Sequence, residues 1–274
     1  MKFFSLIKTF KRLFLHKKKY FMKNQRHLRD LSKEFNRKFY GYYLVYKFFY
    51  TEIALLGPKN KTARLRNYYQ KTNDDEFGKN FDPRYKFKFM DVFVDNVNTW
   101  NFFIEKNNLI SNTGKYLEIG CFEGMSSIFI LSTLADTECH FVDPFIQYDE
   151  INDAAGINEF DEIYENFHHN VSYFENRVNI YRETSDNFFV NNKLMFDLIY
   201  IDGSHFGEDV YKDSINSFNS LNVNGYIIFD DFFWIHFDKL INNPLGGIFK
   251  FLIENKSRLK IIYLSDQLFI QKIS

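Results

Sequence analysis

The feature that most constrains the fold is a regular alternation of short apolar segments with longer amphipathic ones, which begins at about Asp91. Short apolar strands that alternate with helices are typical of a parallel sheet covered by helices on both faces. The last two apolar segments, 259–264 and 268–273, are separated by only a few residues. Because a parallel connection needs about a dozen residues or more, this pair is predicted to form an antiparallel hairpin.

The alternation predicts an α/β fold, doubly wound around a mostly parallel, seven-stranded sheet. The expected strands are 116–119, 139–142, 178–181, 197–201, 226–230, 259–264 and 268–273. The expected helices are 91–107, 124–134, one that ends at about residue 175, a short one from residue 186, 207–221 and 247–255. The chain has 274 residues, of which 45% are hydrophobic, and this is enough to fill the core of such a domain.

Residues 1–90 differ from the rest and are expected to form an N-terminal helical extension and linker, followed by one domain over residues 91–274. Residues 1–50 carry 14 Lys and Arg against 2 Asp and Glu, whereas residues 51–274 carry 21 against 33. The net charge of zero therefore combines a basic arm with an acidic domain. This acidity argues against a catalytic face that binds nucleic acid.

Residues 1–38 have apolar side chains at helical spacing with cations between them, which predicts a basic amphipathic helix. These charges interrupt every stretch that would suit a signal peptide. Two alternatives stay open for residues 1–23. One is a helix that is solvated or packs against the acidic domain or a second subunit, and the other is a helix that lies in a membrane interface. The apolar segment 39–57 contains Lys47 and Glu52, which favours a packed helix over a membrane span.

The chain has two cysteines, Cys121 and Cys139, and neither has the spacing of a zinc ligand. So few cysteines argue against a disulfide scaffold and indicate a reducing compartment. The expected location is therefore the cytoplasm, or the inner face of a membrane if the basic arm binds one. Cys121 lies in a glycine-rich turn, where it is expected to be a small filler.

That turn belongs to a strand, a glycine loop and a helix start within Lys115–Leu131. The loop reads Glu118-x-Gly120-x-x-x-Gly124, where Gly120 allows a sharp turn close to a ligand and Gly124 allows tight helix packing. The next strand ends at Asp143, 23 residues after Gly120, where an acid binds ribose hydroxyls in nucleotide-binding sheets. Taken alone, the loop also suits an ordinary strand–turn–helix.

Together with the final hairpin, these residues resemble the class I S-adenosylmethionine-dependent methyltransferases, whose Rossmann-like sheet has seven strands with the last one antiparallel. The pattern IDGSH…D…L…GYIIFDD is similar to the branch with cephalosporin-biosynthesis and macrolide-sugar O-methyltransferases, themselves akin to catechol O-methyltransferase. The resemblance covers about residues 91–273. It implies S-adenosyl-L-methionine as cofactor, bound by Glu118, Gly120 and Ser126 at the methionine end, Asp143 at the ribose, and Ser185 and Asp186 near the adenine. Gly124, in the same loop, is also expected in the cofactor site.

Three aspartates stand at the carboxyl ends of two strands that are neighbours in such a sheet. They are Asp202, after the strand 197–201, and the pair Asp230–Asp231, at the end of the strand from Tyr226. Because neighbouring strands lie about 4.8 Å apart, we expect the three carboxylates to converge on one ion. Oxygen ligands without cysteine suit Mg²⁺, and the related enzymes place metal-ligating acids at these strand ends.

His205 follows Asp202 by three residues, and the catechol-type relatives carry a catalytic base at that offset. An imidazole, with an ordinary pKa near 6.5, is suited to take a hydroxyl proton near neutral pH. The alternatives are a hydrogen-bonded residue at a helix start, and transfer by alignment of the reactants alone.

Several other residues carry weaker signals. Trp234 and Phe232 are expected to form a wall of the substrate pocket, and His236 is a candidate to face the substrate. His140 is expected in or near the core, and His168 and His169 on a solvated helix face.

The sequence therefore predicts a metal-dependent O-methyltransferase that acts on a hydroxyl of a small molecule, a sugar or a glycolipid. A second hypothesis is a catalytically silent S-adenosylmethionine-binding scaffold, which would be favoured if the aspartates did not converge. A third is a dinucleotide-dependent oxidoreductase, which the missing third-glycine spacing and the antiparallel hairpin disfavour.

Overall fold

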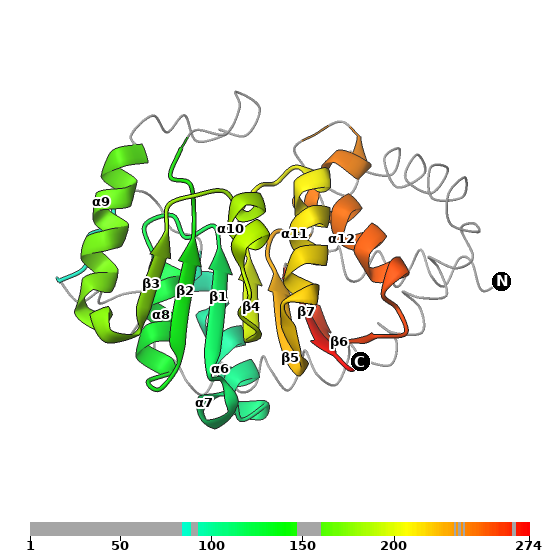
Figure 1. Cartoon of the computed structure of the whole chain (residues 1–274), viewed down its shortest axis with the longest axis horizontal. Coiled ribbons are helices and arrows are strands. Elements are labelled where there is room, and N and C mark those ends of the chain that lie inside the picture. Colours follow the sequence, from blue (N-terminus) through cyan, green and yellow to red (C-terminus); the bar gives the residue numbers. More distant parts are fainter. Residues whose placement is uncertain are drawn as a thin grey trace.

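The computed structural model describes residues 84–88, 93–146, 160–232, 234, 237, 239–264 and 267–274. It contains a seven-stranded sheet with the strand order β3-β2-β1-β4-β5-β7-β6 (Figure 1). The strands are β1 (Lys115–Ile119), β2 (Glu138–Val142), β3 (Val178–Tyr181), β4 (Phe196–Ile201), β5 (Leu221–Phe229), β6 (Leu259–Leu264) and β7 (Leu268–Lys272).

The direction of the strands agrees with the sequence-based prediction. Strands β1 to β5 pair in parallel, and β7 lies antiparallel between β5 and β6. The two final strands form the predicted antiparallel hairpin. The α/β class, the seven strands and the antiparallel last strand are thus confirmed.

Helices cover both faces of the sheet (Figure 1). They are η2 (Phe93–Asn96), α6 (Val97–Lys106), α7 (Leu109–Asn112), α8 (Met125–Thr133), α9 (Phe160–Val171), η3 (Ser172–Arg177), α10 (Ser185–Asn191), α11 (Gly207–Asn219), η4 (Leu240–Asn242) and α12 (Pro244–Glu254). Side chains of α10, α11 and α12 share one buried cluster with the sheet, and side chains of α6, α8 and α9 share the other.

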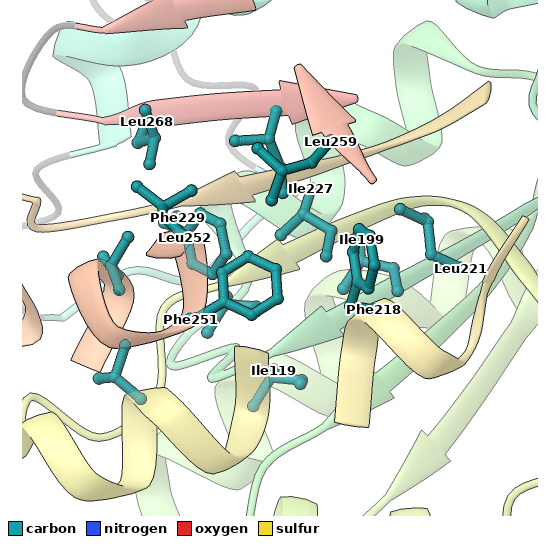
Figure 2. Close-up of a cluster of buried hydrophobic side chains, with 14 of the residues drawn as sticks. Ile119, Ile199, Phe218, Leu221, Ile227, Phe229, Phe251, Leu252, Leu259 and Leu268 are labelled. Carbon is teal, nitrogen blue, oxygen red and sulfur yellow. The ribbon is translucent and has the colours of Figure 1, made fainter. Parts of the chain in front are cut away.

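The strands supply both clusters because successive side chains of a strand point to opposite faces. In β1, Leu117 belongs to the cluster of α11 and α12, whereas Tyr116 belongs to the cluster of α6 and α8. Figure 2 shows the first cluster, in which Phe218 of α11 and Phe251 of α12 pack over Ile227 of β5. A sheet that is buried on both faces explains why its strands read as continuous apolar runs.

The element boundaries differ from the prediction in three places. β5 begins at Leu221, where a helix was expected to end, because Leu221 pairs with Phe196 ahead of an irregularity in the register. α12 begins at Pro244 and not at Gly247, with proline in the first turn, where its missing N–H costs no hydrogen bond. The short helix α7 was not predicted.

Most of the predicted N-terminal extension, including the arm 1–38 and the segment 39–57, lies outside the described residues. Residues 84–88 are described and run beside α9. There, the side chain of Asn170 accepts a hydrogen bond from Lys86 N at 2.6 Å and donates one to Lys86 O at 2.8 Å. The backbone N–H of Lys88 donates to the carboxylate of Glu123 at 3.0 Å. This end of the linker is therefore bound to the domain. Among the described residues, no helix is long and apolar enough to cross a membrane.

Candidate active site

The loop after β1 requires glycine at two positions. Gly120 has φ +84°, and a Cβ added to it would lie 2.0 Å from the backbone oxygen of Asp202. Gly124 has the same φ, and its added Cβ would lie 2.9 Å from the ring of Phe167. The first glycine therefore allows this loop to touch the end of β4, and the second allows α8 to approach α9.

Glu118 is fully buried in β1 and accepts hydrogen bonds from three hydroxyl groups. The donors are Ser126 at 2.5 Å, Ser127 at 3.0 Å and Tyr116 at 3.0 Å. Burial, followed by the charge of Glu118, raises the pKa of Tyr116 well above its ordinary value. Glu118 and Ser126, both predicted at the methionine end of the cofactor, are thus in direct contact and join β1 to the first turn of α8.

Asp143 follows β2 and holds the loops after β1 and β2 together. One carboxylate oxygen accepts the backbone N–H groups of Cys121 at 2.8 Å and Phe122 at 3.2 Å, and the other accepts that of Phe145 at 2.7 Å. Part of the residue reaches the surface, but its carboxyl is enclosed. Desolvation raises the pKa of this carboxyl, and the three N–H donors oppose the rise.

The two residues predicted near the adenine begin α10. Ser185 hydrogen-bonds to the carboxyl of Asp213 on α11, whereas Asp186 is exposed. Burial raises the pKa of Asp213 to about 7. β3, which precedes α10, ends beside β2, where the carbonyl of Tyr181 accepts the N–H of Asp143 at 3.1 Å. The predicted ribose and adenine residues therefore lie at the same edge of the sheet.

The ends of β4 and β5 carry the three predicted acids, and Tyr200 connects two of them. Its hydroxyl lies 2.9 Å from Asp202 Oδ2 and in very short contact with Asp230 Oδ2. Asp230 also accepts hydrogen bonds from Gln267 Nε2 at 3.1 Å and from the N–H of Asp231 at 2.7 Å. Burial raises the pKa of both Asp202 and Asp230, and nearby carboxylates add to the rise.

A possible ligand cluster forms at this edge from Asp202, His205 and Asp231, whose ligand atoms lie within 4.8 Å of one another. The three residues line a cavity of about 10 Å³, which is room for about one water molecule or ion. Asp231 reaches it from a left-handed backbone conformation, with φ +50°. Asp202 and Asp231 thus converge as predicted, while the Asp230 carboxylate is turned to Tyr200 and Gln267, and His205 takes the third place.

His205 is paired with Asp231 and lies beside the ring of Trp234. Its Nε2 lies 2.7 Å from Asp231 Oδ2, and its ring centroid lies 4.7 Å from that of Trp234. Both members of the pair remain partly exposed, with side-chain exposures of 31% and 35%. His205 is therefore hydrogen-bonded and accessible at the same time.

The aromatic prediction for the pocket is wrong for Phe232 and stays a prediction for Trp234. Trp234 is partly exposed beside His205, but Phe232 is fully buried and stacks on Phe249 at 6.4 Å, in the core cluster of α12. A buried phenylalanine and one lining a pocket look alike in a sequence with 35 phenylalanines. His236 lies outside the described residues.

Two further expectations, for Cys121 and His140, agree with the structure, and the one for His168 and His169 agrees in part. Cys121 is buried with its thiol toward backbone carbonyls, and burial raises its pKa well above the ordinary value, as suits a filler. His140 is buried in the sheet with Nδ1 at 3.1 Å from the hydroxyl of Tyr181. His168 is exposed, whereas His169 is half-buried and lies 2.8 Å from the carbonyl of Arg84.

Sequence reasoning missed Tyr200 and Gln267, which bind the acids directly. Tyr200 lies in an apolar strand, where core residues are expected. The available signal was its position two residues before Asp202, because side chains two residues apart along a strand point to the same face. Gln267 lies in the short turn of the hairpin, where nothing in the local sequence indicates contact with β5.

Comparisons with known proteins show what this domain is similar to. Residues 117–232, from β1 to the residue after Asp231, match a family described as a methyltransferase domain. The O-methyltransferase TomG of Streptomyces achromogenes, which is involved in tomaymycin synthesis, has a similar structure, with a TM-score of 0.50 at 8% identity over 78% of this chain and 90% of TomG. The methyltransferase PaMTH1 of Podospora anserina, solved with SAH, has a TM-score of 0.50 at 16% identity over 78% of this chain and 97% of PaMTH1.

The comparison with curated proteins gives no match. At these low identities, the two solved structures show a shared fold, and the family match adds the type of domain. The matched residues include the glycine loop, Asp143 and the acids at the ends of β4 and β5. Residues 117–232 are therefore similar to a methyltransferase domain, and the sheet that contains them has the fold of the two solved methyltransferases.

Proposed function

We propose that the protein transfers the methyl group of S-adenosylmethionine to a hydroxyl group of a small molecule, a sugar or a glycolipid. The observation that carries the proposal is the contact between Gly120 of the glycine loop and the end of β4 at Asp202. This contact brings the expected cofactor loop next to the cluster of Asp202, His205 and Asp231. A methyl donor on the loop and a hydroxyl acceptor at the cluster would then be neighbours, which methyl transfer requires.

The proposed cofactor site follows the edge of the sheet from β1 to β3. Gly120 allows the backbone to approach the cofactor, and Asp143 is the proposed partner of the ribose hydroxyls. Glu118 and Ser126 support the methionine end, and Ser185 and Asp186 are proposed near the adenine. In this arrangement, Asp143 would bind the cofactor and also keep its hydrogen bonds to the glycine loop after β1.

A divalent metal at the ends of β4 and β5 is part of the proposal, and the donor set fits one. Asp202 and Asp231 offer carboxylate oxygens close together, which suits Mg²⁺. Asp230 is the third proposed acid, connected to Asp202 through Tyr200. When bound, such an ion would lower the pKa of an acceptor hydroxyl.

His205 is the proposed general base. In the pair with Asp231, its Nε2 donates to the carboxylate when the imidazole is neutral, and Nδ1 is then the nitrogen that can take a proton. As the acceptor oxygen forms its bond to the methyl carbon, the bond from that carbon to sulfur breaks, and the hydroxyl proton passes to His205. The products are the methyl ether and S-adenosylhomocysteine, and Asp231 stabilises the imidazolium.

Methyl transfer to fractionated small-molecule and lipid extracts tests the function. With an isotope-labelled methyl group on S-adenosylmethionine, mass spectrometry should find a product that gains one labelled methyl group. A protein with Asp202→Asn and Asp231→Asn should bind the cofactor and yield no product. If the wild-type protein binds the cofactor and labels nothing in any extract, the result favours the hypothesis of a catalytically silent S-adenosylmethionine-binding scaffold.

Chelator tests the metal separately. Excess chelator should abolish turnover and leave cofactor affinity, measured by calorimetry, nearly unchanged, because the two sites are adjacent but use different residues. Full turnover in chelator would contradict the metal and leave the pair of His205 and Asp231 as the catalytic groups. The oxidoreductase alternative is not carried forward, because neither the antiparallel β7 nor the methyltransferase family match supports it.

The proposal also includes peripheral membrane contact through the basic residues 1–23. An enzyme held at an anionic surface would share that surface with a lipid-linked acceptor. The basic arm and a glycolipid acceptor therefore support each other as hypotheses.

A further inference from the structure

Behind the acids of the candidate site lies a buried hydrogen-bond network that joins distant parts of the chain. Trp100 of α6 and Gln267 of the β6–β7 turn are both fully buried. The indole Nε1 of Trp100 donates to Gln267 Oε1 at 2.8 Å, and Gln267 Nε2 donates to Asp230 Oδ2 at 3.1 Å. The rings of Trp100 and Tyr200 also meet edge to face, with centroids 4.8 Å apart.

The direction of the Gln267 amide follows from its partners. An indole N–H is only a donor, so the atom that faces Trp100 must be the amide oxygen. The amide nitrogen is then left to face Asp230, where it meets an acceptor. Trp100 thus determines that Gln267 presents a donor to the carboxylate, and a buried polar network with matched donors and acceptors holds its members in one arrangement.

The network continues from Asp230 to His205. While Asp230 Oδ2 is held by Gln267 and Tyr200, Asp230 Oδ1 accepts the backbone N–H of Asp231 at 2.7 Å. Asp231 has φ +50°, a conformation that is uncommon outside glycine and that asparagine and aspartate tolerate best. From this turn, the Asp231 carboxylate reaches His205 Nε2 at 2.7 Å.

We propose that Gln267 is a positioning residue of the methyl-transfer site: its amide, oriented by Trp100, holds the Asp230 carboxylate, which in turn fixes the Asp231 turn and the pair of Asp231 and His205. The inference rests on the proposed function for its catalytic meaning, but the chain of contacts can be tested without catalysis. Gln267 itself touches neither cofactor nor acceptor in this scheme.

The two tryptophans of the chain lie at opposite ends of these contacts. Trp100 binds Gln267, and the ring of Trp234 lies 4.7 Å from that of His205, between the ring centroids. A ¹⁵N-labelled protein should therefore show two indole N–H signals in NMR spectra, one for each end. Gln267→Glu keeps an acceptor for Trp100 but places a carboxylate against Asp230. We expect both indole signals to move by more than their linewidths.

Trp100→Phe is the second variant, for the case in which Gln267→Glu does not fold. It preserves an aromatic ring but removes the donor that orients the amide. The remaining indole signal belongs to Trp234, and we expect it to move, although Trp234 itself is unchanged. S-adenosylmethionine affinity, measured by calorimetry, should stay unchanged in both variants because Gln267 is not part of the proposed cofactor site.

Gln271→Glu is the matched control, with the same substitution in the same hairpin. Gln271 donates to the hydroxyl of Tyr226 at 3.0 Å, near the start of the paired part of β5, away from the acids. The Trp234 signal should stay in place in this variant. A Trp234 signal that stays at its wild-type position in Trp100→Phe, or in folded Gln267→Glu, overturns the positioning role. A wild-type protein without methyl-transfer activity contradicts the proposed function, whereas the Trp234 signal decides the role of Gln267 in either case.

Discussion

Asp143, at the end of β2, connects two strained turns, one after β1 and one after β2. Phe122 and Phe145 both have φ +48°, which is rare for bulky side chains, and both donate their backbone N–H to Asp143. Such a conformation costs about 1–3 kcal/mol and persists only where surrounding contacts hold it. Asp143 therefore has a role in the loop in addition to the proposed one at the ribose.

Asp143→Ala should weaken S-adenosylmethionine binding, by about 1.5–3 kcal/mol for each charge-assisted hydrogen bond to the ribose that is lost. Release of the two strained turns should add to the effect. Calorimetry measures the affinity, and Asp161→Ala, whose side chain is 88% exposed on α9, serves as the control. Equal affinities in Asp143→Ala and the control would show that the carboxylate has only its structural role.

His205→Ala should lower the rate of methyl transfer by about 10²- to 10⁴-fold, the usual contribution of a general base. Because the side chain is 31% exposed, the variant should fold and should still bind the cofactor. His168→Ala, at an exposed position of α9, is the matched control. A loss of less than about threefold would leave His205 as a hydrogen-bonded residue beside Asp231 and would favour transfer by alignment alone.

At the scale of single residues, the sequence predicted positions better than it predicted partners. Asp202, His205 and Asp231 could be found because the carboxyl ends of neighbouring parallel strands meet at one edge of a sheet. The direction of the Asp230 carboxylate could not be predicted, because it depends on Tyr200 and Gln267. Gln267 is 37 residues away in the chain. Phe232 was placed wrongly because burial is decided by neighbours such as Phe249, which local sequence does not reveal.

At the scale of elements, the strands were predictable because both faces are buried. Most of them contain a run of apolar residues, and the spacing between runs distinguishes a crossover from a hairpin. The start of β5 was missed because Leu221 to Tyr226 includes asparagines, glycine and a left-handed residue at Asn224, which are poor strand signals. The pairing of Leu221 with Phe196 overrides these local preferences.

The contact between α10 and α11 should make stability depend on pH through Asp213. Burial raises the pKa of this carboxyl from 3.8 to about 7, despite the hydrogen bond with Ser185, and Asp186 and Asp209 add to the rise while Lys212 opposes it. The folded state therefore binds a proton that the unfolded state has released between about pH 4 and pH 7. This contribution is complete below the unfolded pKa and is lost as pH rises through the folded pKa.

Asp213→Asn should remove that dependence. Between about pH 5 and pH 8, the free energy of unfolding of the wild-type protein should fall by about 2–3 kcal/mol relative to the variant. Urea unfolding at a series of pH values measures the difference. Asp136→Asn, at an exposed position after α8, should keep the wild-type profile. Parallel profiles for the wild-type protein and Asp213→Asn would mean that the carboxyl stays ionised in the fold.

At the scale of the whole molecule, charge is divided between two parts of the chain. The basic residues 1–50 precede an acidic remainder, and the net charge of zero conceals the division. Two kinds of partner suit the arm: an acidic protein surface, on this domain or on a second subunit, and an anionic membrane. The described end of the extension, residues 84–88, is bound to α9 and to Glu123 beside the glycine loop. The described end of the extension therefore lies on the side of the domain where the cofactor site is proposed.

Liposome flotation distinguishes the two partners. Residues 1–23 carry eight Lys and Arg, and each cation near an anionic membrane is worth about 1 kcal/mol, so together they could hold the enzyme at such a surface. The full-length protein should float with anionic vesicles at low salt, stay behind with neutral vesicles, and lose its binding as salt screens the charges. A chain without residues 1–23 should not float, and replacing Lys17, Lys18 and Lys19 by Gln should weaken flotation while leaving the apolar stripe intact. If the full-length protein stays at the bottom with anionic vesicles, the arm does not bind membranes but is solvated or packs against protein, and the methyl acceptor need not be a lipid.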